Sequence, residues 1–87
     1  MKIDFSNLPV QWNLEGEPQH VDIRKSLGNH IHQQTGDLAE DELAKRIYFS
    51  EGPVELTAEE AKTVNAYVKR NYVVPVWQAV ERATANP

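Results

Sequence analysis

Two histidines one residue apart, His30 and His32, stand in the stretch NHIHQQTGD, which ends at Asp37. Imidazole and carboxylate groups are ligands for zinc, and they also serve as general acids and bases. On a strand, residues two apart share a face, whereas on a helix they point roughly 200° apart. The secondary structure of this stretch therefore decides whether the two rings can serve one site.

The apolar residues around the histidines predict a helix. Ile23, Leu27 and Ile31 recur every four residues, which is the period of one helical face. We expect this helix to start at Asp22, an N-cap residue type, and to end near position 35. His30 then borders the apolar stripe and His32 faces solvent, so that the two rings cannot share an ion.

Glycines and polar residues predict the ends of the helices. Gly36 suits the left-handed position that ends many helices, and Gly52 suits the same position one helix later. His20 and Asp37 are available as further metal ligands, but no spacing in the sequence requires them. We assign no metal-binding residue.

Nucleophilic catalysis has little support in the sequence. The chain has no cysteine, and its serines (Ser6, Ser26 and Ser50) lie in no Gly-x-Ser-x-Gly context. The four glycines are isolated, so that no phosphate-binding loop is present. The carboxylates cluster where helices are expected to start, and capping explains them there. We therefore assign no catalytic residue and no cofactor.

Composition sets the class of the protein. The 87 residues fit a single small domain (1–87), with short strands and turns over 1–21 and a helical part over 22–84. Apolar residues make up 40% of the chain, enough for one thin core. A net charge of −4 makes nucleic acid an improbable partner. No apolar run reaches the roughly 20 residues of a membrane span, and the start lacks a signal-peptide core, so that we expect a cytoplasmic protein without membrane contact.

Period-two alternation predicts the strands. Ile3 and Phe5 form one alternating pair, and Val10, Trp12 and Leu14 form another after the turn-forming sequence SNLP. A third extended piece, residues 19–21, would pair back on residues 10–14. The fold class is α+β and mainly helical, with three to four helices packed on a small N-terminal antiparallel sheet. Residues 54–56 are an optional edge strand.

Two capping signals predict the next helices. Asp37 with Glu40 resembles a capping box, and the buried face of the helix that follows would consist of Leu43, Ala44, Ile47 and Tyr48. Thr57 with Glu60 forms a fuller box, and the buried face of that helix would consist of Ala61, Val64, Val68 and Tyr72. Pro75 then either starts a fourth helix or kinks the third. Residues 84–87 should fray.

The first two helices and their short turn also match a helix-turn-helix motif. The base-reading positions would be residues 38–42, and three of them are carboxylates that phosphate would repel. Two antiparallel packed helices are the favoured interpretation.

The segment AYVKRNYVVPVWQ carries aromatic and basic residues of the kinds enriched at binding hot spots. The candidate interaction surface consists of Tyr67, Lys69, Arg70, Tyr72 and Trp77. Tyr67 lies off the buried stripe and should be partly exposed, and the break at Pro75 should leave backbone groups near residues 72–73 free to pair with another chain. The alternative is that these aromatic residues fill the core.

The order of several motifs resembles that of small phage- and prophage-encoded proteins of unknown function. The motifs are MKIDF, LEGEP, ELAKRIY, VELTAEE and YVVPVWQAV, in that order along the chain. The resemblance implies an accessory protein of a phage or mobile element, and it carries over no catalytic residue.

We therefore expect a non-enzymatic protein–protein interaction module with an unknown protein partner and a possible homodimer. A nucleic-acid-associated regulator acting as a dimer is the alternative, and a metal-dependent activity ranks third.

Overall fold

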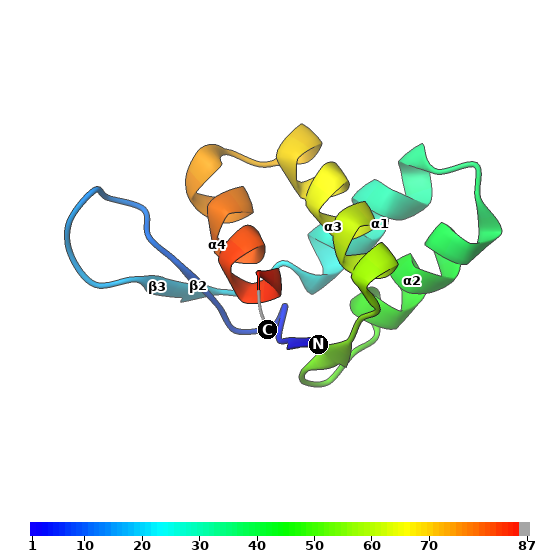
Figure 1. Cartoon of the computed structure of the whole chain (residues 1–87), viewed down its shortest axis with the longest axis horizontal. Coiled ribbons are helices and arrows are strands. Elements are labelled where there is room, and N and C mark those ends of the chain that lie inside the picture. Colours follow the sequence, from blue (N-terminus) through cyan, green and yellow to red (C-terminus); the bar gives the residue numbers. More distant parts are fainter. Residues whose placement is uncertain (86–87) are drawn as a thin grey trace.

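A computed structural model describes residues 1–85 of the chain. The elements follow in the order β1 (Lys2–Ile3), β2 (Leu8–Val10), β3 (Gln19–Val21), α1 (Arg24–Gln34), α2 (Leu38–Tyr48), β4 (Val54–Glu55), α3 (Ala58–Asn71) and α4 (Val74–Thr84). The expected α+β class is confirmed, with helices in the majority (Figure 1).

The strands form two separate antiparallel sheets of two strands each, where one N-terminal sheet was expected. β1 pairs with β4, which places Ile3 opposite Val54. β2 pairs with β3, which places Leu8 opposite Val21 and Val10 opposite Gln19. Residues 54–55 thus join the first strand, so that the start of the chain is tied to the segment that leads into α3.

The second strand lies earlier in the sequence than the alternation predicted. β2 starts at Leu8 and ends at Val10, so that Pro9 belongs to a strand and not to a turn. Both Leu8 and Val10 are buried, whereas Trp12 and Leu14 are exposed. Proline is tolerated here because a two-stranded sheet consists of edge strands only. The predicted strand over residues 10–14 was wrong because the chain leaves the core after Val10.

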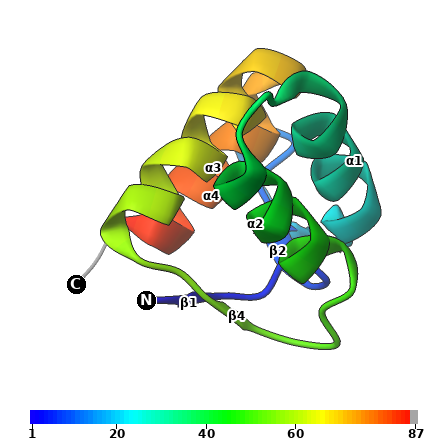
Figure 2. The same ribbon diagram turned by 90° about the vertical axis from the view of Figure 1, so that its right-hand side faces the viewer.

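The helices pack as two antiparallel pairs. α1 and α2 lie side by side and run in opposite directions (Figures 1 and 2), which confirms the packed-helix interpretation of this segment. α3 and α4 form the second pair, and α4 also covers β2. The largest fully buried side chains come from β2, the turn before it and all four helices, and are Phe5, Leu8, Val10, Leu27, Ile31, Leu43, Ile47, Val64, Val68 and Val80.

The capping box of α3 is confirmed in full. The Thr57 hydroxyl accepts the Glu60 backbone N–H at 3.1 Å, and the Glu60 carboxylate accepts the Thr57 N–H at 2.9 Å. Arg46 also donates to the Glu60 carboxylate at 2.6 Å, so that the cap links α3 to α2. These hydrogen bonds hold the pKa of Glu60 below its usual range, with the bond from Arg46 as the largest cause.

The cap of α2 differs from the prediction. Asp37 is the N-cap, but its carboxylate accepts the N–H of Ala39 at 2.7 Å, and Glu40 does not complete the box. The Glu40 carboxylate instead accepts the hydroxyls of Thr35 at 2.7 Å and Tyr67 at 2.8 Å. Glu40 therefore accepts from Tyr67 of α3, and not from the backbone N–H of Asp37 as the capping box predicted.

The predicted start of α1 and two predicted glycine stops were also wrong. Ile23 is the N-cap of α1, and the Asp22 carboxylate accepts the Arg24 N–H at 3.0 Å from one position further out. Gly36 and Gly52 do not adopt the left-handed conformation, which within residues 1–85 belongs to Gly16 alone. The end of α1 is instead an extended residue, at position 35.

Pro75 lies in a separate fourth helix. Tyr72 and Val73 are extended and divide α3 from α4, and Pro75 occupies the second helical position, where a missing N–H costs no intrahelical bond. The Tyr72 N–H donates to Val68, and the Val73 carbonyl accepts from the first turn of α4. These two groups are therefore engaged, and not free as predicted. Residues 84–87 were predicted to fray, but Thr84 is the last residue of α4. Residues 86–87 lie outside the described residues.

Candidate functional site

The structure divides the five predicted interaction residues between two sides of α3. Tyr67 is only 7% exposed, and its hydroxyl donates to Glu40 of α2. The Arg70 guanidinium lies 5.0 Å from the Tyr67 ring centre. The predicted partial exposure of Tyr67 was wrong, because its hydroxyl finds a carboxylate from another helix and its ring is covered.

The other three predicted residues are also engaged within the fold. The Tyr72 hydroxyl lies 2.6 Å from that of Ser26 on α1, and burial raises the pKa of Tyr72. Lys69 lies over the Trp77 ring, at 5.1 Å, and pairs with a carboxylate of α4. Tyr72 therefore faces α1, whereas Lys69 of α3 contacts Trp77 of α4, so that the five residues do not form one continuous patch.

The two central histidines point in different directions, as the helical period predicted. His30 packs edge-on against Tyr72, with ring centres 5.5 Å apart. His32 instead pairs with Asp41 of α2 through Nδ1. Within residues 1–85, no group of three or more histidine or carboxylate side chains is placed to hold a metal ion.

A groove runs between α1 and α2 on their outer side. It encloses about 240 Å³ and is lined by Gly28, Asn29, His32, Ala44, Lys45, Tyr48 and Phe49. We call it the α1–α2 groove. The sequence analysis assigned no site to this surface.

Gly28 makes the groove possible. A Cβ at this position would lie 2.8 Å from the Cβ of Tyr48 and 2.9 Å from the backbone oxygen of Ala44. Because Gly28 has no side chain, the two helices approach closely, and its backbone forms the floor of the groove. A glycine inside a helix lowers helix stability by about 1 kcal/mol relative to alanine. A glycine within the predicted helix, directly after Leu27, was therefore the sequence signal for a close helix–helix contact.

Aromatic side chains form one wall of the groove. Phe49, directly after α2, is 74% exposed and packs edge-on against Tyr48, with ring centres 4.7 Å apart. Lys25 lies over the other aromatic ring, with Nζ 5.9 Å from the centre of Tyr48. Phe49 therefore faces solvent next to Tyr48, and the Tyr48 ring lies near the Lys25 ammonium group.

The charges at the rim of the groove are mostly positive. Asp41 accepts from His32 and pairs with Lys45 at 3.3 Å. The hydrogen bond from His32, followed by the one from Lys45, lowers the pKa of Asp41. The carboxylate is thus compensated by its neighbours, and Lys25 leaves the rim with a positive excess in a chain whose net charge is −4.

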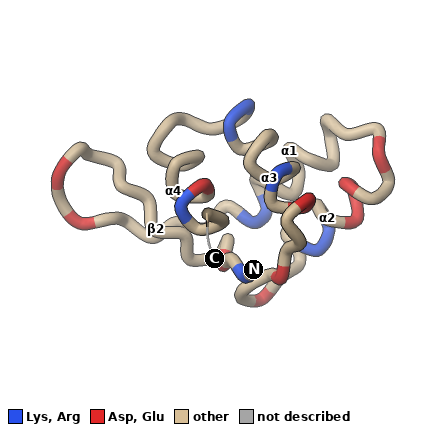
Figure 3. Tube along the Cα trace, in the orientation of Figure 1, with Lys and Arg blue, Asp and Glu red and all other residues tan. Residues whose placement is uncertain are grey.

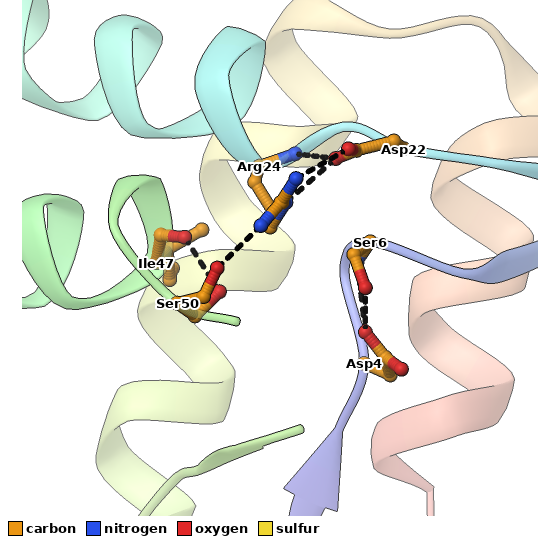
Figure 4. Close-up of polar contacts among 6 residues, drawn as sticks. All are labelled: Asp4, Ser6, Asp22, Arg24, Ile47 and Ser50. Carbon is orange, nitrogen blue, oxygen red and sulfur yellow. Dashed lines mark hydrogen bonds and ion pairs between the residues drawn. The ribbon is translucent and has the colours of Figure 1, made fainter. Parts of the chain in front are cut away.

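Arg24 makes polar contacts with Asp22 and with Ser50, the residue after Phe49 (Figure 4). Its guanidinium donates to the Asp22 carboxylate at 3.0 and 2.8 Å, and a third bond reaches the backbone oxygen of Ser50. The Ser50 hydroxyl in turn donates to Ile47 of α2 at 2.8 Å. Arg24 therefore joins the start of α1 to the end of α2, and it holds the pKa of Asp22 below its usual range.

The second exposed apolar feature is the connection between β2 and β3, residues 11–18, which we call the hairpin tip. It projects from one end of the molecule, away from α1 and α2 (Figure 1). Trp12 is 43% exposed and Leu14 is fully exposed. The charged residues of the tip, Glu15 and Glu17, are both acidic (Figure 3).

Comparisons with protein-family models, curated proteins and solved structures found no match for this chain. Among the helices of residues 1–85, none has both the length and the apolar character needed to cross a membrane.

Proposed function

We propose that the chain is a non-enzymatic protein-binding module, and that the α1–α2 groove receives a short segment of a partner protein. The observation that supports this most directly is Phe49, a large apolar side chain left 74% exposed on the wall of a groove floored by glycine. A large apolar side chain exposed at the wall of a concave surface offers a contact for an apolar group of another molecule.

The size of the groove favours a single side chain over a small-molecule ligand. Its volume of about 240 Å³ lies below the roughly 300–1,000 Å³ of typical ligand pockets. One large apolar side chain of a peptide would fit inside it. Lys25, which lies beside the Tyr48 ring and is not paired with Asp41, would then favour a carboxylate next to that side chain.

The positions of the basic residues favour a protein partner over nucleic acid. Ion pairs join Arg24 to Asp22, Lys45 to Asp41, Arg46 to Glu60 and Lys69 to Glu81. Each of these cations already has an acidic neighbour, so that they do not form the free basic stripe that phosphate binding requires. The motif order that resembles phage-encoded proteins would place the module among the accessory proteins of a phage or mobile element.

Selection from a random peptide library on the immobilised protein tests this function. We expect enriched peptides to share one large apolar residue next to an aspartate or glutamate. Phe49→Ser should weaken their binding at least about tenfold, which corresponds to about 1.4 kcal/mol. Val73→Ser is the matched control, because Val73 is 60% exposed but lies between α3 and α4.

Circular dichroism would verify that both variants remain folded. Peptides that bind wild type and Phe49→Ser equally well would contradict the groove as the site. A library without any enriched sequence would contradict the binding function itself.

A further inference from the structure

The hairpin tip carries the chemistry that the α1–α2 groove would accept. Leu14 is fully exposed and is followed directly by Glu15, with Glu17 two residues further on. The groove offers an apolar cavity, and Lys25 lies beside it over the Tyr48 ring, in excess of the Lys45–Asp41 pair. An apolar side chain next to carboxylates thus meets an apolar cavity next to an ammonium group.

The tip is held in shape before any contact is made. The side-chain amide of Gln11 donates to the backbone oxygens of Asn13 at 3.2 Å and Gly16 at 2.7 Å. Gly16 has a φ of 113°, which glycine adopts without strain. A tip that is already ordered loses little conformational entropy when it binds.

We propose that the hairpin tip of one copy of this chain occupies the α1–α2 groove of a second copy, with Leu14 in the cavity and Glu15 and Glu17 near Lys25. This rests on the proposed function of the groove and names its partner. Within one chain the contact cannot form, because the tip lies at one end of the long axis and the α1–α2 pair at the other (Figure 1). The second copy must therefore supply it.

The contact joins the tip of one copy to the groove of another, so that the first copy keeps an unoccupied groove and the second an unoccupied tip. A first pair of copies retains a free tip and a free groove, unless the two copies exchange tips and close as a dimer. A tip of eight residues also covers less area than a standard interface of roughly 1,600 Å². We therefore expect weak association, with dissociation constants on the order of 10–500 μM.

Sedimentation equilibrium of the full chain over a concentration series tests the contact. The wild type should exceed its monomer mass of 9.9 kDa, increasingly so as concentration rises. Leu14→Asp, which lacks the apolar side chain of the tip, and Phe49→Ser, which lacks the wall of the groove, should each remain monomeric. Val73→Ser, an exposed apolar residue outside both surfaces, should associate like the wild type.

Mixing the two defective variants provides the decisive observation. Leu14→Asp keeps an intact groove and Phe49→Ser keeps an intact tip, so that their equimolar mixture should form a one-to-one complex and stop there. Glu15→Gln combined with Glu17→Gln should weaken wild-type association several-fold at low salt and make it less salt-dependent.

Three results would overturn the proposal: a monomeric wild type at about millimolar concentration, association that persists in either single variant, or a mixture that stays monomeric. None of these would affect peptide capture by the groove in the library selection, so that failure of the self-contact is distinguishable from failure of the proposed function.

Discussion

At the scale of single residues, Thr57 is the clearest case of a local interaction that affects the whole fold. Its hydroxyl accepts a hydrogen bond from the backbone N–H of Glu60, and the Glu60 carboxylate accepts one from the backbone N–H of Thr57. We expect Thr57→Ala to lower the free energy of unfolding by about 1 kcal/mol, measured by urea denaturation. Thr63→Ala, inside the same helix, is the control and should cost less than about 0.5 kcal/mol. Equal losses in the two variants would mean that the cap contributes nothing specific.

Glu60 should also make stability depend on pH. Its pKa is lowered from 4.5 in the folded state, mainly by the hydrogen bond from Arg46. The stabilisation is therefore fully present above pH 4.5 and is lost as pH falls through the lowered folded pKa. In urea titrations from about pH 6 to about pH 2.5, Glu60→Gln should be less stable than wild type at the upper end, and the difference should shrink in acid.

The control for this titration is Glu59→Gln, which removes a charge from the same first turn of α3 without removing the ion pair to Arg46. Its difference from wild type should be smaller at every pH. If the deficit of Glu60→Gln stayed constant down to the most acidic sample, the ion pair would not be its cause.

At the scale of elements, the α1–α2 contact depends on a position without a side chain. Alanine is favoured over glycine inside a helix by about 1 kcal/mol. At position 28, however, the added Cβ would lie 2.9 Å from the backbone oxygen of Ala44, which cannot move without shifting α2. The steric conflict should therefore outweigh the helix propensity.

We expect Gly28→Ala to lower the free energy of unfolding by about 1–2 kcal/mol. Gly36→Ala is the control, because nothing lies within 4 Å of its Cβ position and its φ is not positive. That variant should be neutral or slightly more stable, since alanine restricts the unfolded chain. A higher urea midpoint for Gly28→Ala would show that the helices are further apart than described.

At the scale of the whole molecule, the hairpin tip is separable from the core. Val10 and Gln19 are paired with each other on either side of residues 11–18. A two-residue Asn-Gly turn can therefore replace residues 11–18 and close the hairpin. We expect this shortened chain to keep its fold and to be no less stable than the wild type, because shortening the loop from eight residues to two lowers the entropic cost of closing it by about 1 kcal/mol.

Val10→Ala is the contrasting variant of the same hairpin. Val10 is fully buried, and its truncation should cost roughly 1–3 kcal/mol. Thermal denaturation followed by circular dichroism would compare the two. A shortened chain that unfolds more readily than Val10→Ala would show that Trp12 and Leu14 support the core after all.

Features decided within one or two helical turns were determined by the sequence alone. The Thr57–Glu60 cap, the buried stripe of Ile23, Leu27 and Ile31, and the interruption near Pro75 all occur where the sequence predicted them. The reason is that caps, helical period and proline geometry depend only on neighbours along the chain.

Features that require a distant partner were decided by the tertiary structure. Alternation predicted a face for Leu14 but not whether anything would cover it, and the chain leaves the core after Val10. Tyr67 is buried with its hydroxyl donating to the carboxylate of Glu40, which was predicted to cap its own helix. The α1–α2 groove likewise exists only because Gly28 meets Ala44 across two helices, and neither residue alone signals that meeting.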